Sequence, residues 1–206
     1  MKKHTTDVYD KIALSGAKDL KATSEISSDY IKSFFNGLPK NSSVLDIGPG
    51  KGAESKIAVN LGHRVTGLDI SSEMAKIYEE NVPEAKCIVS SMTEIPEGVG
   101  QFNALISLCS LLHLDRANGI KALREFFRVL KPGGQLLLAT SVSNGEEEEV
   151  SPDWLKDVGA DSWYFYHWDK NDFLSSIKAQ GFSTNDTREE TLVDGRPDIL
   201  FVRACK

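Results

Sequence analysis

The sequence lacks the features that mark membrane-spanning, secreted and disulfide-stabilised proteins. None of its apolar runs reaches the roughly 18 residues that a membrane-spanning helix needs. The N-terminal residues lead into no apolar segment of the signal-peptide type. The three cysteines are an odd number at unrelated spacings, which indicates reduced thiols rather than a disulfide framework. We therefore expect a cytoplasmic protein with no membrane partner.

Basic residues are also in short supply, and this bears on the partners of the protein. Lys and Arg number 24 against 30 Asp and Glu, for a net charge of -6, and they form no basic stripe along the chain. Because phosphate neutralisation needs clustered Lys and Arg, we expect no extended nucleic-acid partner and favour a small-molecule substrate. His, Cys, Asp and Glu never recur at the spacing of a metal site, so we expect no metal.

What the sequence does contain is a regular alternation of strand and helix patterns. Its length suits a single domain, since domains typically run to about 100–200 residues. The alternation predicts an α/β fold, a doubly wound and mostly parallel sheet with helices on both faces. The predicted strands are Val44–Ile47, Arg64–Asp69, Lys86–Ser90, Phe102–Leu108, Leu136–Ala139, one that opens at Gly181 and Phe182, and Ile199–Val202; the predicted helices are Ala53–Asn60, one capped near Ser71 and running to Asn81, Arg116–Leu130 and Asn171–Gln180.

The most informative segment is a glycine-rich loop after the first predicted strand. Gly48, Gly50 and Gly52 stand at alternate positions, directly after the strand that contains Asp46. A sharp turn from strand to helix needs residues that tolerate positive φ, and the missing side chains let a ligand lie against the backbone. Asp69 ends the next apolar run, about 20 residues downstream, where a βαβ unit places a carboxylate on a ribose. This combination predicts a site for a nucleoside-containing cofactor.

The glycine spacing distinguishes between cofactors. The dinucleotide fingerprint is Gly-x-Gly-x-x-Gly, whereas this chain reads Asp-x-Gly-x-Gly-x-Gly from Asp46, and an acid there suits an ammonium group better than a pyrophosphate. The pattern resembles the first motif of the class I (Rossmann-like) S-adenosylmethionine-dependent methyltransferases, of the small-molecule type 11/25 subgroup. The segment from Ala122 to Gly134 resembles that family's helix and turn before its fifth strand. The resemblance runs from about Val44 to the C-terminus and implies a seven-stranded sheet with an antiparallel C-terminal strand.

The resemblance also implies a set of cofactor-binding residues. The glycine loop packs against the methionyl part of the cofactor, Asp69 binds the ribose hydroxyls, Ile70 packs on the adenine, and Leu108 borders the methionyl part. Family members commonly carry an Asp that contacts the adenine amino group where this chain has Ser91. The Ser91 hydroxyl can still accept a hydrogen bond, and the Met92 backbone alone is the alternative. The implied set for S-adenosylmethionine and its product S-adenosylhomocysteine is Asp46, Gly48, Gly50, Gly52, Asp69, Ile70, Ser91, Met92 and Leu108.

The sequence names no catalytic residue. In this family the methyl group of the cofactor is already activated, so the protein mainly aligns the acceptor, and a base is needed only when the acceptor is protonated at neutral pH. His113 and His167 are the candidate bases because histidine titrates near neutral pH. A structural hydrogen bond or simple packing explains each of them at least as well.

Regular patterns end between Val142 and Trp168. Four consecutive glutamates at 146–149 predict a solvated loop. An aromatic-rich stretch follows, and we expect Trp163, Tyr164 and Trp168 to form an apolar or cation-binding wall for the acceptor.

We expect one methyltransferase domain, as a monomer or homodimer. It divides into an N-terminal helical lid (1–41), a cofactor-binding core (42–141), an acceptor-side insert (142–168) and a C-terminal helix with a β-hairpin (169–206). The implied activity is methyl transfer to an O, N or C atom of a small-molecule acceptor. Three alternatives stay open: a non-enzymatic or regulatory protein that binds the same cofactor, an NAD(P)-dependent oxidoreductase, which the glycine spacing disfavours, and a propylamine transferase, which usually needs further acidic residues.

Overall fold

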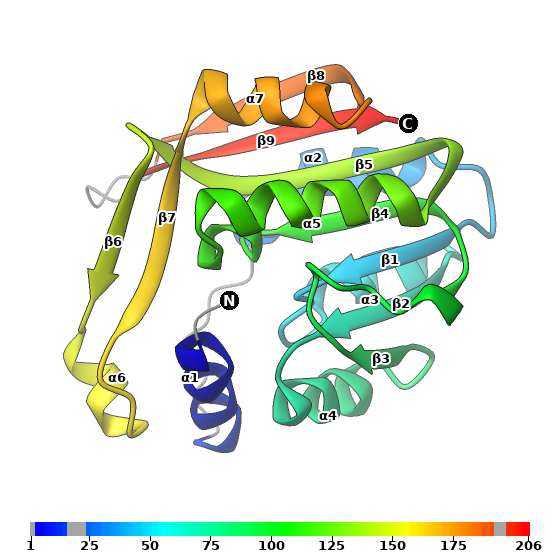
Figure 1. The fold of residues 1–206 in the computed structure, drawn as a ribbon. Helices are drawn as coiled ribbons and strands as arrows, with labels where there is room; N and C mark the ends of the chain where they lie inside the picture. Colours follow the sequence, from blue (N-terminus) through cyan, green and yellow to red (C-terminus); the bar gives the residue numbers. More distant parts are fainter. Residues whose placement is uncertain (1–2, 16–23, 192–196) are drawn as a thin grey trace.

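A nine-stranded sheet forms the centre of the molecule (Figure 1). The computed structural model describes residues 3–15, 24–191 and 197–206, so parts of the predicted N-terminal lid (1–2 and 16–23) lie outside the described residues. The strands are β1 (Ser43–Ile47), β2 (Arg64–Asp69), β3 (Lys86–Val89), β4 (Phe102–Leu108), β5 (Leu130–Ser143), β6 (Glu146–Val150), β7 (Trp163–Asp169), β8 (Ser183–Glu190) and β9 (Asp198–Cys205).

The strand order confirms the predicted fold class. Strands β1 to β5 are parallel in the order β3-β2-β1-β4-β5, and β9 pairs antiparallel with both β5 and β8. These are the seven strands expected, including the antiparallel C-terminal strand. The sheet has two strands more than predicted, because β6 and β7 form an additional antiparallel hairpin.

Helices cover both faces of the sheet because neighbouring side chains of each strand point to opposite sides. Leu136 and Leu138 of β5 pack with one apolar cluster, towards α5 and α7, whereas Leu137 and Ala139 pack with the other, towards α2, α3 and α4. In the described part of the chain, none of the helices is long and apolar enough to cross a membrane. The helices are α1 (Lys3–Leu14), α2 (Ser24–Asn36), α3 (Ala53–Asn60), α4 (Ser72–Asn81), α5 (Arg116–Val129), α6 (Asp153–Asp157) and α7 (Lys170–Ala179), with short 3₁₀ turns at Glu97–Val99 and Leu111–His113.

Local capping explains where several helices begin. The Ser71 hydroxyl accepts a hydrogen bond from the Met74 amide at 2.9 Å, and α4 begins at the next residue, as predicted. Asp115 caps α5 in the same way through the Asn118 amide, at 2.8 Å. Such side-chain acceptors satisfy amides that have no partner within the first turn of a helix.

The predicted insert is a β-hairpin: the glutamates at 146–149 are exposed to solvent, as predicted, but they form a strand rather than a loop. Strand β6 contains all four glutamates and pairs with β7 from Glu146↔His167 to Val150↔Trp163. The hairpin joins the main sheet only at the end of β5, where Val142 lies opposite Trp168. In Figure 1 it projects from the end of the sheet to which the arrows of β1, β2 and β4 point.

Helix α1 lies between this hairpin and α4 (Figure 1). Val8 and Ile12 of α1 form a small apolar cluster with Met74 of α4 and with Leu155 of α6, beyond the tip of the hairpin. The helix therefore covers the region next to the carboxyl ends of the parallel strands, which is where open α/β sheets bind ligands.

Candidate cofactor and acceptor site

The glycine loop turns from β1 into α3 with all three glycines at positive φ. The φ values are 63° at Gly48, 53° at Gly50 and 82° at Gly52. A Cβ atom on Gly48 would lie 2.5 Å from Ser110 Cβ, and one on Gly52 would lie 2.5 Å from Val82 Cγ2. A Cβ on Gly50 would meet no described atom within 4 Å. Gly48 and Gly52 are therefore needed for packing, whereas Gly50 borders open space that a ligand can occupy.

Asp46 is a buried carboxylate beside this loop. It is 3% exposed, and one oxygen, Oδ2, accepts a hydrogen bond from the Ser55 hydroxyl at 2.6 Å. Burial raises the pKa of Asp46 to about 8; the bond from Ser55 lowers it, and the nearby Glu54 and Asp69 raise it further. A cation placed next to Asp46 would offset this cost, so the site favours a ligand with a positive group.

Asp69 ends β2, the strand next to β1, as the sequence predicted. It is 8% exposed, and its Oδ1 accepts a hydrogen bond from the Ser71 amide at 2.9 Å. Burial raises the pKa of Asp69 to about 6; backbone hydrogen bonds from Ser71 and Ile70 oppose the shift, and the charge of Asp10 adds to it. The backbone bonds fix the orientation of the carboxylate at the carboxyl end of β2.

The other predicted cofactor residues also follow or end strands at this carboxyl end of the sheet. Ile70 follows Asp69 and is half-buried, and Met92 is half-buried against the core. The Ser91 hydroxyl lies 2.8 Å from the Thr93 hydroxyl and accepts from the Thr93 amide at 3.2 Å, so it forms part of a local turn. Leu108 ends β4 and is buried.

The residue after β4 has an uncommon backbone conformation. Cys109 has a φ of 56°, and its amide donates to the Ala139 carbonyl at 2.8 Å. Positive φ is uncommon for residues other than glycine, and such residues cluster at functional sites. The chain leaves the sheet at this turn. The Ser110 hydroxyl donates to the Ile47 carbonyl at 2.8 Å, and this bond holds the turn beside the glycine loop, which begins at the next residue.

Two residues of α1 that sequence reasoning did not select lie at this site. Asp10 Oδ1 accepts from the Ser71 hydroxyl at 2.5 Å, and the Tyr9 hydroxyl lies 2.8 Å from His113 Nε2. Burial, together with the charges of Asp69 and Cys109, raises the pKa of Tyr9 well above its usual value. An apolar helical pattern predicts that a helix packs, but it does not say which surface the helix covers.

His113 is held in one tautomer. Its Nδ1 lies 3.0 Å from the Tyr164 carbonyl, which can only accept, so Nδ1 carries the proton and Nε2 accepts from Tyr9. Burial lowers the pKa of His113 to about 4, and the Tyr164 carbonyl only partly opposes this. A neutral ring with both nitrogens engaged anchors α1, which supports the structural reading of His113 over the role of a base.

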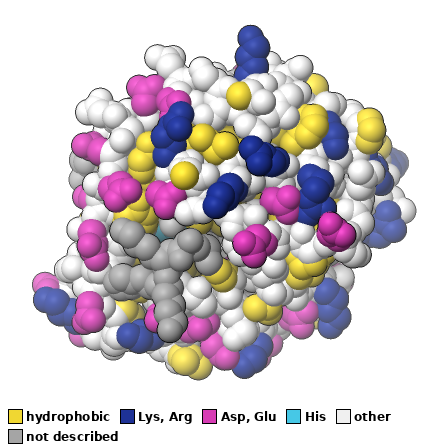
Figure 2. Space-filling view, in the orientation of Figure 1, with side chains coloured by type: hydrophobic (Ala, Val, Ile, Leu, Met, Phe, Trp, Pro, Cys, Tyr) yellow, Lys and Arg dark blue, Asp and Glu magenta, His cyan; other side chains and the backbone are white. Residues whose placement is uncertain are grey.

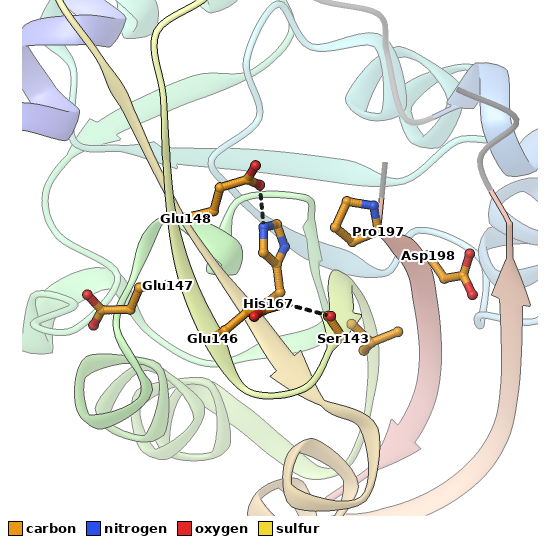
Figure 3. Close-up of a pocket in the computed structure, with 8 residues that line it drawn as sticks. Ser143, Glu146, Glu147, Glu148, His167, Pro197 and Asp198 are labelled. Atoms are coloured by element: carbon orange, nitrogen blue, oxygen red, sulfur yellow. Dashed lines mark hydrogen bonds and ion pairs between the residues drawn. The ribbon is translucent and has the colours of Figure 1, made fainter. Parts of the chain in front are cut away.

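His167 has a different environment, a chain of three polar side chains next to a cavity of about 660 Å³ (Figure 3). The ring is 5% exposed; Nδ1 lies 2.8 Å from the Ser141 hydroxyl, and Nε2 lies 2.8 Å from Glu148 Oε2. Because a carboxylate only accepts, Nε2 carries a proton and donates it to the hydrogen bond with Glu148, while Nδ1 and the Ser141 hydroxyl share the second hydrogen bond. The cavity is lined by Val142, Ser143, Glu146, Glu147, Glu148, His167, Pro197 and Asp198.

Aromatic side chains of β7 divide between two faces of the hairpin. Trp163 and Phe165 are half-buried on the face that also carries His167, and the Trp163 ring stacks on His113 at 5.6 Å. Tyr164 and Trp168 lie on the opposite face and pack into the core, so the predicted acceptor wall is wrong for these two residues. The period of two along a strand explains the division.

The fold is Rossmann-like, and it brings Asp46, the glycine loop and Asp69 together at the carboxyl ends of β1 and β2. Comparison with known proteins gives the family: residues 45–138 match the model of a family described as "Methyltransferase domain". These residues, which include Asp46, the glycine loop and Asp69, are thus similar to a methyltransferase domain.

Individual relatives agree with this assignment. The chain is 31% identical over 147 residues to "Putative methyltransferase YqeM" of Bacillus subtilis, covering 63% of this chain and 60% of that protein. It is 27% identical over 188 residues to the mouse tRNA (carboxymethyluridine(34)-5-O)-methyltransferase ALKBH8, covering 91% of this chain and 26% of that protein. The chain thus spans less than two thirds of these relatives.

A solved structure shares the fold over nearly the whole chain. It is the Burkholderia thailandensis 1,6-didemethyltoxoflavin-N1-methyltransferase, with bound 1,6-didemethyltoxoflavin and S-adenosylhomocysteine. The TM-score is 0.72 at 17% identity, and the match covers 98% of this chain and 88% of the other.

Proposed function

We propose that this protein is an enzyme that transfers a methyl group from S-adenosylmethionine to an O, N or C atom of a small-molecule acceptor and releases S-adenosylhomocysteine. The observation that carries the proposal is the pair of buried carboxylates, Asp46 and Asp69, on adjacent strand ends beside the open space at Gly50. Burying two such acids is costly unless a ligand satisfies them. S-adenosylmethionine has both an ammonium group and a ribose diol, and each matches one carboxylate.

Each predicted cofactor residue has a role in this proposal. Asp46 and the backbone of Gly48, Gly50 and Gly52 hold the methionyl part, with Leu108 beside it. Asp69 accepts hydrogen bonds from the ribose hydroxyls, Ile70 packs on the adenine, and Met92 and Ser91 border the adenine edge. When bound, the cofactor supplies a methyl group activated by its sulfonium charge, so the main task of the chain is to orient the acceptor and exclude water.

In this proposal the parts of the chain divide the work. Residues 1–41 act as a lid through α1, residues 42–141 hold the cofactor, and the hairpin within 142–168 faces the acceptor. Residues 169–206 complete the sheet. We propose a monomer or homodimer of this single domain.

Charge supports a small-molecule acceptor over a nucleic acid. The net charge is -6, and β6 places a row of glutamates beside the cavity. On the face drawn in Figure 2, Lys and Arg side chains are interspersed with Asp and Glu rather than gathered in one stripe. The Burkholderia neighbour with a small heterocycle bound agrees with this proposal, whereas the mouse relative acts on tRNA and makes tRNA the necessary comparison.

Calorimetric titration with S-adenosylmethionine, S-adenosylhomocysteine, NAD⁺ and NADH tests the cofactor. We expect saturable binding of the first two only, and binding of a dinucleotide alone would favour an oxidoreductase. Transfer of labelled methyl groups to a panel of phenols, primary amines, carboxylic acids and tRNA that carries carboxymethyluridine then tests the acceptor. Cofactor binding without any transfer would favour a regulatory protein, and transfer to tRNA alone would overturn the small-molecule proposal.

A further inference from the structure

The polar chain Ser141–His167–Glu148 links the core of the sheet to the cavity. Ser141 and His167 are buried, whereas the Glu148 side chain is 49% exposed. Glu148 Oε2 accepts a hydrogen bond from His167 Nε2, and Oε1 is not part of this bond. Figure 3 shows Glu148 directed at the imidazole and Glu147 directed away from it. A buried histidine thus fixes the orientation of a carboxylate that a ligand can reach.

The Ser141–His167–Glu148 series lies near the strand ends of the proposed cofactor site. Ala139 of β5 pairs with Leu108 at the end of β4, and Ser141 is two residues further along β5. A series of ring contacts connects the same two places: the Tyr9 ring lies 5.3 Å from His113, His113 lies 5.1 Å from Phe165, and Phe165 stacks on His167 at 6.1 Å. The cavity thus adjoins the carboxyl end of β5, beside that of β4, and this is where we place the acceptor.

The charges around Glu148 restrict the acceptor. On β6, Glu146 accepts from the Ser143 hydroxyl at 2.9 Å, and Glu147 also lines the cavity. On β9, Asp198 lines the opposite side. Among the described residues that line the cavity there is no Lys or Arg. A neutral or cationic acceptor is therefore favoured, and an anionic one is repelled.

We propose that Glu148, held in place by His167 and Ser141, takes the proton that the acceptor loses, and that the acceptor attacks through an O–H or N–H group. The inference rests on the proposed methyl transfer. In the step, a lone pair on the acceptor atom forms a bond to the methyl carbon while the carbon–sulfur bond breaks and its electrons stay on sulfur. The O–H or N–H proton passes to the Glu148 carboxylate, and the products are the methylated acceptor and the neutral thioether.

A carboxylate is basic enough for this task because the acceptor atom becomes positive as the new bond forms, which makes its proton acidic. We treat His167 and Ser141 as positioning residues, because both side chains are buried and His167, although it lines the cavity, has both ring nitrogens engaged by Ser141 and Glu148. The competing explanation is that the chain only fastens the hairpin to β5, and the two explanations differ in what a neutral side chain at position 148 does.

The test compares Glu148→Gln with Glu149→Gln. Gln at 148 keeps an oxygen for the His167 bond but cannot take a proton. Glu149 lies on the other face of β6, is bonded to Ser162 and does not line the cavity, so its substitution is a matched control. Calorimetry with S-adenosylhomocysteine comes first, because a wild-type protein that does not bind it would refute the proposed function itself. Labelled methyl transfer follows, to phenols and primary amines and also to pyridines, whose ring nitrogen has no proton to lose.

We expect Glu148→Gln to lower kcat for the phenol or amine by about 100-fold or more, which is the size typical of losing a general base. His167→Gln should lower kcat less, with KM little changed, because Glu148 remains but is poorly oriented. Glu149→Gln and the S-adenosylhomocysteine affinity of all variants should match the wild type. Wild-type kcat in Glu148→Gln would overturn the inference. So would cofactor binding with transfer only to pyridines, or with no transfer at all.

Discussion

At the scale of single residues, Asp69 has the most direct test. Its carboxylate is held by backbone amides at the end of β2 and is proposed to accept two ribose hydroxyls. Hydrogen bonds to charged groups contribute about 1.5–3 kcal/mol each. We therefore expect Asp69→Ala to weaken S-adenosylhomocysteine binding at least ~100-fold in calorimetry, with unchanged far-UV circular dichroism. Glu84→Ala, an exposed acid after α4, is the control. Normal affinity in Asp69→Ala would refute the ribose assignment.

Substitutions at two of the loop glycines should have different effects on stability and on cofactor binding. Gly52→Ala combines positive φ with a 2.5 Å contact to Val82 Cγ2, so we expect it to lower the free energy of unfolding by about 2 kcal/mol or more. Gly50→Ala faces open space and should cost only about 1 kcal/mol through its backbone. It should nevertheless weaken S-adenosylhomocysteine binding at least ~10-fold, because the new methyl group enters the ligand space. Urea unfolding and calorimetry measure the two effects, and equal affinity in Gly50→Ala would contradict the assignment.

Sequence reasoning located those residues of the site that belong to a local motif. Asp46, Asp69 and the glycines lie at adjacent strand ends as predicted, because a βαβ unit fixes their spacing. Their contacts with a cofactor remain a prediction. Tyr9 and Glu148 could not be found in this way, since Tyr9 meets His113, more than 100 residues away, and Glu148 meets a histidine across a hairpin. Such roles depend on tertiary packing, which no local pattern records.

At the scale of elements, α1 is held over the site by few polar contacts. Tyr9→Phe removes the hydroxyl that donates a hydrogen bond to His113 Nε2. This nitrogen is then buried without that partner, which should lower the free energy of unfolding by about 1–3 kcal/mol. We expect faster amide hydrogen exchange in α1, by about tenfold or more, with little change in exchange of the central strands. Tyr30→Phe on α2 also removes a tyrosine hydroxyl bond, to Asp186, and should leave α1 unchanged. Equal exchange in wild type and Tyr9→Phe would show that packing alone holds the lid.

The helices and strands also show which sequence patterns predict secondary structure. Continuous apolar runs and a three-to-four-residue apolar period predicted β4 and α5 to within one residue, whereas β5 begins six residues before the predicted Leu136 and ends four residues after Ala139. Strand β6 was missed because its four glutamates have no apolar alternation; it is an edge strand whose partner β7 supplies the pairing. Charged side chains on an edge strand disfavour pairing with other chains, so this composition suits the position.

At the scale of the whole molecule, the two buried acids couple stability to pH. Burial raises the pKa of Asp46 to about 8 and that of Asp69 to about 6, above the ordinary value of an aspartate, so the folded protein binds protons that the unfolded chain has released. Their stabilising effect is complete below the unfolded pKa and is lost as pH rises through the folded values. We therefore expect the free energy of unfolding of the ligand-free protein to fall between about pH 4 and pH 8 through these two groups.

Because of the same two acids, the ligand should stabilise the protein most at the pH at which the ligand-free protein is least stable. S-adenosylhomocysteine presents an ammonium group that favours ionised Asp46, so the Kd should fall as pH rises from 6 to 8, and the melting-temperature shift caused by saturating ligand should grow. Asp46→Asn removes the group with the higher pKa, and its unliganded stability and its Kd should both be nearly independent of pH between 7 and 8. Thermal unfolding and calorimetry of both proteins across this range measure the coupling. A ligand shift that shrinks with pH in the wild type, or one that is identical in Asp46→Asn, would show that Asp46 does not face the cation.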